Sequence, residues 1–175
     1  MDAYLYRKVN ELSPGQTVRL VDPHSDIINT QHKPLVKWFP DGLSYNGCQW
    51  AEATLTNPNQ SIEAIREWLL EIARRGEYEE CPSRFQAVVV FETVKSAKRA
   101  ARQIGLHDRY DIFKISDVDP TGPFYSQHRR GTTIPEVLLD AEQYWNQTPH
   151  RSGEREYLLK CPVTVDSLVD TVSSD

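Results

Sequence analysis

The short, almost continuously apolar run at residues 85–91 constrains the fold of this chain more than any other segment. It contains Val88-Val89-Val90, and β-branched residues in series favour strands over helices. The run is also too short for a helix of ordinary length. We therefore predict a buried strand here, and the rest of the domain has to be built around it.

The other periodic segments alternate between strand and helix patterns. Strand patterns occupy residues 4–9, 17–21, 110–116 and 157–165, the last with Pro162 inside it, which indicates an edge or a bulge. Helix patterns run from Ser61 to Gly76, from Ser96 to Gly105 and from residue 134 to 145, with Pro135 at a first-turn position. The predicted inward residues of the first helix are Ile62, Ile65, Trp68, Leu69 and Ile72. This order, without a glycine-rich dinucleotide fingerprint, predicts an α+β domain.

Residues 22–59 show no sustained period and contain several prolines and aromatic residues. We predict a long, aromatic-anchored loop region with short elements at best. Loops of this length in a compact domain are usually functional.

Length and charge set further limits. A chain of 175 residues is predicted to form a single domain, here residues 1–168, followed by a flexible polar tail at residues 169–175. The formal net charge of −5 argues against a general polyanion-binding surface. Neither the three cysteines nor the five histidines have metal-ligand spacing, so we expect reduced, packed cysteines and no metal site.

No apolar run has the length of a membrane span, and residues 1–4 do not begin a secretory signal. The expected location is the cytoplasm, which is also compatible with delivery into a target cell by a dedicated system.

Two polar residues stand next to predicted strands. Arg7 lies within the first strand, where its planar fork of donors suits a phosphate or carboxylate, although an arginine on the solvent face is the simpler interpretation. Ser83 precedes the apolar strand, where a hydroxyl can orient a carboxylate or a ribose or can simply serve a turn. No G-x-S-x-G elbow surrounds Ser83, which argues against a serine hydrolase.

Glu154 and Glu156 precede the last strand, and the alternation of a strand places both on one face. Two like charges on one face repel unless a cation or ligand offsets them. The pair is therefore a candidate for acid–base work or for stabilising a cation, with ordinary surface glutamates as the alternative.

Taken together, these motifs resemble the arginine-serine-glutamate class of mono-ADP-ribosyltransferases, the cholera- and pertussis-toxin-like group. The resemblance is carried by Leu5-Tyr6-Arg7, by Ser83 before a central strand and by Glu154-x-Glu156. Pro82-Ser83-Arg84-Phe85 and Tyr144-Trp145-Asn146 are similar to an uncharacterised bacterial or phage branch of that superfamily. The family's serine motif is Ser-Thr-Ser, so Arg84 brings an unexpected charge to this position, and Ser44 is a second candidate for the serine.

The resemblance implies a split β-sheet core with flanking helices and NAD as substrate, without a metal. Arg7 would bind the phosphates, Glu156 would stabilise the oxocarbenium-like cation, Ser83 would hold Glu156, and Glu154 would activate a macromolecular acceptor, protein rather than nucleic acid. The candidate residues for stacking on nicotinamide are Tyr45, Trp50 and Phe85.

Two other functions remain open. A non-catalytic module on the same fold could bind protein or nucleic acid through the basic stretch at residues 95–109. An NAD-hydrolysing toxin would need Glu156 and not Glu154. We expect a binding module to have no reason to keep two repelling carboxylates beside a buried strand.

Overall fold

The computed structural model describes residues 1–22, 33–56, 62–103, 109–151 and 154–172. Its strands are β1 (Ala3–Lys8), β2 (Thr17–Val18), β3 (Ala87–Val90), β4 (Tyr110–Ile115), β5 (Thr121–Tyr125), β6 (Arg155–Lys160), β7 (Val163–Thr164) and β8 (Ser167–Val172). Its helices are α1 (Lys33–Trp38), α2 (Tyr45–Thr56), α3 (Ile62–Glu77), α4 (Val94–Gln103) and α5 (Ile134–Trp145), with a 3-10 turn, η2, at Ser126–Arg129. Among these described helices, none is long and apolar enough to cross a membrane.

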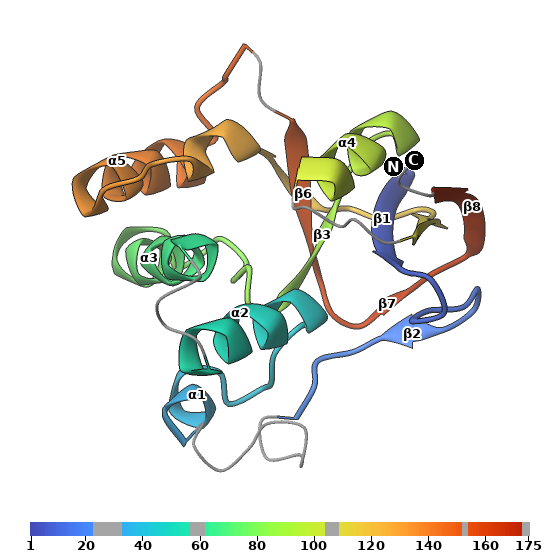
Figure 1. Cartoon of the computed structure of the whole chain (residues 1–175), viewed down its shortest axis with the longest axis horizontal. Coiled ribbons are helices and arrows are strands. Elements are labelled where there is room, and N and C mark those ends of the chain that lie inside the picture. The colour runs from blue at the N-terminus through green and yellow to red at the C-terminus, as the bar shows by residue number, and fades with distance from the viewer. Residues whose placement is uncertain (23–32, 57–61, 104–108, 152–153, 173–175) are drawn as a thin grey trace.

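The strands form small antiparallel sheets. One has the order β1-β4-β8, another β3-β6-β5, and β2 pairs with β7. A bridge between Tyr4 and Phe91 connects the first sheet to the second. Figure 1 shows α3 and α5 lying side by side, away from β8 and β1. The α+β class predicted from the sequence is confirmed.

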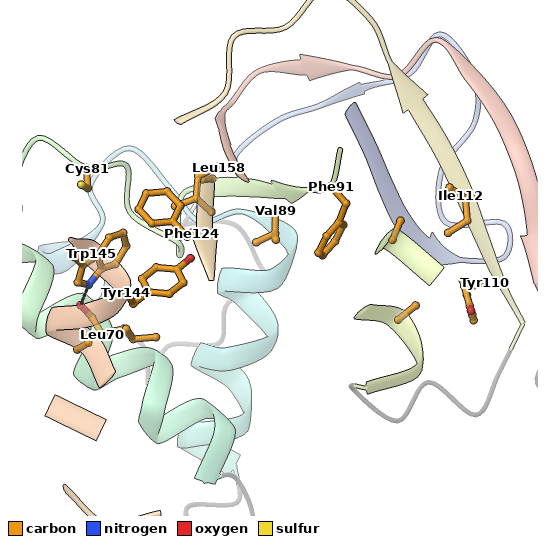
Figure 2. Packing of buried hydrophobic residues seen from close by; sticks show 14 residues of the cluster. Leu70, Cys81, Val89, Phe91, Tyr110, Ile112, Phe124, Tyr144, Trp145 and Leu158 are labelled. Atoms are coloured by element: carbon orange, nitrogen blue, oxygen red, sulfur yellow. Dashed lines mark hydrogen bonds between the residues drawn. The ribbon is translucent and has the colours of Figure 1, made fainter. Parts of the chain in front are cut away.

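The strand predicted at residues 85–91 lies at the centre of the core. All four residues of β3 are buried, and their side chains alternate between two apolar clusters. Val88 and Val90 pack with Leu5 and Phe113 of the other sheet. On the opposite face, the cluster in Figure 2 packs β3 and β6 against side chains of α3, α4 and α5. The indole of Trp145 donates to the Leu70 carbonyl at 2.9 Å within it, which ties α5 to α3.

Residues 33–38 and 45–56 are helical, so the prediction of a long loop region with only short elements was wrong for α2. The reason is tertiary packing: α1 and α2 enclose an aromatic cluster in which Phe39 stacks on Phe85 with ring centres 5.0 Å apart. Gly47 lets α2 approach closely, because a Cβ there would lie 2.2 Å from the Phe85 carbonyl oxygen. Ser44, the alternative serine of the resemblance, begins α2 by accepting the Gly47 amide at 3.1 Å.

The polar C-terminal segment also differs from its prediction. Residues 169–172, expected in a flexible tail, belong to β8 and pair with β4. The side of β4 that faces away from β1 offers backbone groups for hydrogen bonding. Polar side chains do not prevent a further strand from pairing with them. Residues 173–175 lie outside the described part. Pro162 separates β6 from β7, and β6 is the central strand of its sheet, not an edge.

Helix α3 has the predicted position, but it buries a different face. The expected inward residues Ile62, Ile65 and Ile72 are exposed. The buried residues of this helix include two glutamates, the set being Ala64, Glu67, Leu70 and Glu71. Burying carboxylates in place of isoleucines requires cationic partners, and those partners belong to the candidate site.

Candidate functional site

A cavity of about 540 Å³ lies among β1, β3, β6, α2, α3, α4 and η2. This volume falls within the range of small-molecule sites, about 300–1,000 Å³. The lining residues that carry charge or a large ring include Arg7, Tyr45, Trp50, Glu67, Arg84 and Glu156. The cavity therefore brings together Arg7, Tyr45 and Glu156, three of the residues that the sequence singled out.

Arg7 is a buried cation in this lining. It is 7% exposed, and its Nη1 donates to the carbonyl of Tyr6 at 2.9 Å. Its guanidinium lies 4.7 Å from the ring centre of Tyr45, whose hydroxyl donates to Glu11 at 2.8 Å. Burial lowers the pKa of Arg7. Among the described residues no carboxylate forms an ion pair with it, although the Glu11 charge acts on it from further away, so an anionic ligand could supply the missing ion pair.

Glu156 lies at the start of β6, is 2% exposed, and is held through one of its two oxygens. Oε1 accepts from the Tyr144 hydroxyl at 2.6 Å and is ion-paired with Arg84. Oε2 has a longer contact, 3.4 Å, with Nη2 of Arg129. Burial raises the pKa of Glu156, but Arg129 and Arg84 outweigh it, and the net shift is downward. The carboxylate is thus charged at neutral pH, and Oε2 retains capacity for a further hydrogen bond.

Glu67 of α3 joins the same cluster from the other side. Its Oε2 accepts from Arg84 Nε at 2.6 Å, and its Oε1 accepts from Arg129 Nη1 at 2.5 Å. Arg84 and Arg129 therefore both bridge Glu67 and Glu156. Two positive and two negative charges balance within this cluster, which leaves Arg7 as the excess buried charge of the cavity.

Acid should weaken the folded protein partly through Glu156. Its folded-state pKa is below the ordinary value of 4.5, so its contribution is present above that pH and is lost as pH falls through the folded-state pKa. We expect the free energy of unfolding of Glu156→Gln to decline less steeply between about pH 5 and pH 3 than that of wild type, in urea titrations. Glu142→Gln, at an exposed position of α5, is the control and should keep the wild-type slope. Equal slopes for Glu156→Gln and wild type would contradict a lowered pKa of Glu156 in the folded protein.

Ser83 does not hold Glu156. Its hydroxyl donates to Oε2 of Glu71 at 2.9 Å, so the predicted contact was wrong. Glu71 also accepts from Arg74 Nη2 at 2.9 Å and from Arg75 Nε at 2.7 Å. Ser83 thus belongs to a second polar cluster that fixes α3 to the segment before β3, and it does not line the cavity. The adjacent Arg84, which departs from the family motif, makes the contact expected of the serine.

Phe85 does not line the cavity either, so its predicted place in the binding site was wrong. It is fully buried, and its ring packs against Phe39 and Trp68, with ring centres 5.0 and 4.6 Å away. Of the aromatic candidates, Tyr45 and Trp50 are in the lining. Burial and the hydrogen bond to Glu11 raise the pKa of Tyr45 to about 12, so its hydroxyl stays protonated at neutral pH.

Glu154 lies on the same side of the chain as Glu156 and is buried, as the alternation predicted. It is ion-paired with Arg99 of α4 and is not part of the cavity lining. Glu154 is thus paired with Arg99, and Glu156 with Arg84 and Arg129, so the mutual repulsion of the two glutamates is offset. The retention of both carboxylates consequently does not distinguish an enzyme from a binding module.

Sequence reasoning missed several lining residues. Glu67 was missed because the isoleucines of its helix dominated the apolar pattern. The available signal was the spacing of Glu67 and Glu71, which are one turn apart and share a face of the helix. Arg129 and Ser126 lie in η2, in a segment for which no element was predicted. Tyr6, next to Arg7, also lines the cavity, and its ring stacks on Phe91 with centres 6.0 Å apart.

In the described parts of the chain, no group of His, Cys, Asp and Glu side chains is arranged to hold a metal ion. The three cysteines are free thiols, with Cys81 buried and Cys48 and Cys161 half-buried.

Comparison with known proteins gives one family. A model described as "Protein of unknown function (DUF2441)" matches residues 8–171, nearly the whole chain. The chain belongs to the DUF2441 family. The matched range contains the whole Glu67, Arg84, Arg129 and Glu156 cluster and begins one residue after Arg7. No curated protein matches the chain.

Proposed function

We propose that this DUF2441 protein binds NAD in the cavity and transfers ADP-ribose from it to a macromolecular acceptor, protein rather than nucleic acid. The observation that carries the proposal is that Arg7 and Glu156, far apart in sequence, line one cavity. A cation for phosphates and a carboxylate for a developing positive charge are the two groups that NAD cleavage requires. Their presence in one cavity is what the resemblance to arginine-serine-glutamate transferases implies.

Arg7 is suited to the pyrophosphate. A buried guanidinium that forms no ion pair among the described residues carries an electrostatic penalty that a phosphate group would reduce. Tyr45 covers one side of this guanidinium. The pyrophosphate would therefore bind at the β1 and α2 side of the cavity, with the nicotinamide ribose extending toward Glu156.

Glu156 is suited to the bond-breaking step. When the bond between the ribose and nicotinamide breaks, its electron pair leaves with nicotinamide and positive charge develops on the ribose. A fixed carboxylate beside that charge stabilises the transition state. Oε2 can accept a hydrogen bond from a ribose hydroxyl, while Arg84 and Tyr144 hold Oε1 in place of the family's serine.

The arrangement of the sheets also supports the proposed transferase-like split core. Two three-stranded sheets are joined at the bridge between Tyr4 and Phe91. Arg7 lies on one sheet and Glu156 on the other, so the cavity lies where the two sheets meet.

Hydrolysis of NAD is the second candidate function, and one observation favours it. Glu154, which would activate the acceptor in a transferase, is ion-paired with Arg99 outside the cavity lining. With Glu154 engaged there, water could take the place of the acceptor nucleophile. In both reactions Glu156 has the same role.

The deciding experiment uses NAD labelled in its adenylate part, incubated with the protein and with cell lysates. Label that becomes attached to a macromolecule supports transfer. Free labelled ADP-ribose together with released nicotinamide supports hydrolysis. If neither product forms, both reactions are rejected and the binding module remains.

Arg7→Met gives a separate test of the phosphate site. We expect affinity for ADP-ribose to fall by about tenfold or more, because a charge-assisted hydrogen bond contributes about 1.5–3 kcal/mol. We expect the free energy of unfolding to stay unchanged or to rise by about 1 kcal/mol, because an unpaired buried cation is lost. Titration calorimetry and urea unfolding measure the two quantities, with Arg19→Met at an exposed position as control. Unchanged affinity would place the phosphates elsewhere.

A further inference from the structure

The 3-10 turn η2 contains two buried polar atoms whose bonding capacity is unused. They are the Ser126 hydroxyl oxygen and Arg129 Nε, and in the described residues no other buried side-chain nitrogen or oxygen lacks a partner. Leaving a buried donor unpaired costs about 1–3 kcal/mol. Both residues belong to the cavity lining. Their coincidence in one turn beside the cavity indicates a shared partner that comes from a ligand.

The turn brings both donor-bearing residues to one cavity. Ser126 and Arg129 are the first and last residues of η2, in which His128 departs from helical geometry, and both residues line the cavity. The Ser126 amide donates to the Glu154 carbonyl at 3.0 Å, which fixes the turn to the start of β6. A hydroxyl and an N–H that line one cavity from the same turn can both donate to a single oxygen acceptor.

The charge of the surroundings selects the kind of acceptor. Nη1 and Nη2 of Arg129 face Glu67 and Glu156, and together with Arg84 these groups form a neutral cluster. A phosphate placed here would meet two carboxylates whose charge is already matched, and it would lack a free cation. A neutral carbonyl oxygen can accept both hydrogen bonds without adding charge.

We infer that Ser126 and Arg129 form a subsite for a neutral carbonyl oxygen next to Glu156. This inference rests on the proposed NAD binding, in which the group beside Glu156 is the nicotinamide, so that the carbonyl is the one in its carboxamide. Because both donor atoms are buried, both side chains must rotate to meet the incoming oxygen, and neither atom has a partner among the described residues that would hold it back. The leaving group would thereby be held at η2 while the phosphates are held at Arg7.

The test compares three probes, NAD, ADP-ribose and free nicotinamide, binding to wild type, Ser126→Ala and Arg129→Lys in titration calorimetry. We expect Ser126→Ala to weaken NAD and nicotinamide by about tenfold and to leave ADP-ribose within about twofold, because ADP-ribose lacks the carboxamide. Arg129→Lys keeps a positive charge but removes Nε, and it should weaken the same two probes. Ser167→Ala, at an exposed position of β8, is the matched control. Thermal unfolding of Ser126→Ala should occur at the wild-type temperature or above it, since the substitution removes a buried hydroxyl that holds no bond.

The outcomes separate this subsite from the proposed function. Wild-type binding of NAD with no effect of Ser126→Ala overturns the subsite and leaves the proposed function standing. Equal weakening of ADP-ribose and NAD assigns the turn to another part of the ligand and also overturns it. Nicotinamide binding that Ser126→Ala removes, without binding of NAD or ADP-ribose, supports the subsite and rejects the proposed function. Wild-type protein that binds none of the three probes rejects both.

Discussion

Glu156→Gln is expected to reduce the rate of NAD cleavage by about 100- to 1,000-fold, the range seen when one preorganised electrostatic group is removed from a transition state. The amide keeps the shape of the side chain but carries no negative charge to set against the charge developing on the ribose. Affinity for NAD should change far less than the rate, because the substitution leaves Arg7, the proposed phosphate ligand, untouched. Nicotinamide release under single-turnover conditions, together with NAD titrations, measures both quantities.

Glu154→Gln provides the matched control for this result. Glu154 is two residues away, buried and paired with an arginine like Glu156, but it lies outside the cavity lining. Nicotinamide release should therefore stay within a few-fold of wild type, and only attachment of ADP-ribose to an acceptor could fall. A loss of cleavage in Glu154→Gln with normal cleavage in Glu156→Gln would show that the two roles are assigned the wrong way round.

Arg84→Met is expected to lower the free energy of unfolding by about 3–5 kcal/mol, the cost of removing one partner from a buried ion pair. The substitution leaves Glu67 and Glu156, 3% and 2% exposed, with Arg129 as their shared cation. Urea unfolding at neutral pH measures the loss. The variant should also cleave NAD more slowly, since Glu156 Oε1 loses one of its two close partners.

A surface ion pair supplies the comparison for Arg84→Met. Lys98 and Asp170 pair with side chains 32% and 36% exposed, so Lys98→Met should cost less than about 1 kcal/mol. If Arg84→Met does not fold, the double variant Arg84→Met with Glu67→Gln removes one stranded carboxylate and should recover part of the stability. An Arg84→Met variant as stable as Lys98→Met would mean that the cluster around Arg84 does not hold the fold together.

Features that depend on local sequence were predictable. The β-branched run of β3 and the first-turn proline of α5 were recognised, and the structure adds a capping box between Thr133 and Glu136 at the start of that helix. Each depends on the conformational preferences of neighbouring residues and needs no distant partner. For the same reason the α+β class followed from the order of the segments.

Features that depend on distant partners were not predictable in this way. The buried face of α3 contains Glu67, whose acceptance by the core requires Arg84, 17 residues further along, and Arg129, 62 residues further along. A helix pattern shows which residues are apolar and not which charges will be matched. The helix α2 likewise depends on packing against Phe85, from another part of the chain.

The candidate site divides along the same line. Arg7 and Glu156 were found through their motifs, and Tyr45 through its aromatic side chain, and all three line the cavity. The segment at Ser83 was correctly predicted to contact Glu156, but the wrong residue was chosen. The side chain that reaches Glu156 is that of Arg84, one residue later. The local turn before β3 decides whether Ser83 or Arg84 faces Glu156, which lies 72 residues after Arg84. Short motifs do not specify that turn.

The bridge between Tyr4 and Phe91 has a thermodynamic consequence for any ligand of this cavity. It consists of two backbone hydrogen bonds, each 2.8 Å long, between sheets that carry Arg7 and Glu156 respectively. A molecule that contacts both residues would hold the two sheets together. Its binding would stabilise the folded arrangement of the sheets, and that arrangement would in turn favour binding. Substitutions that weaken the contact between the two sheets would thus lower the affinity for such a ligand without touching its binding residues. Ligands that contact only one sheet would leave the contact between the sheets unchanged.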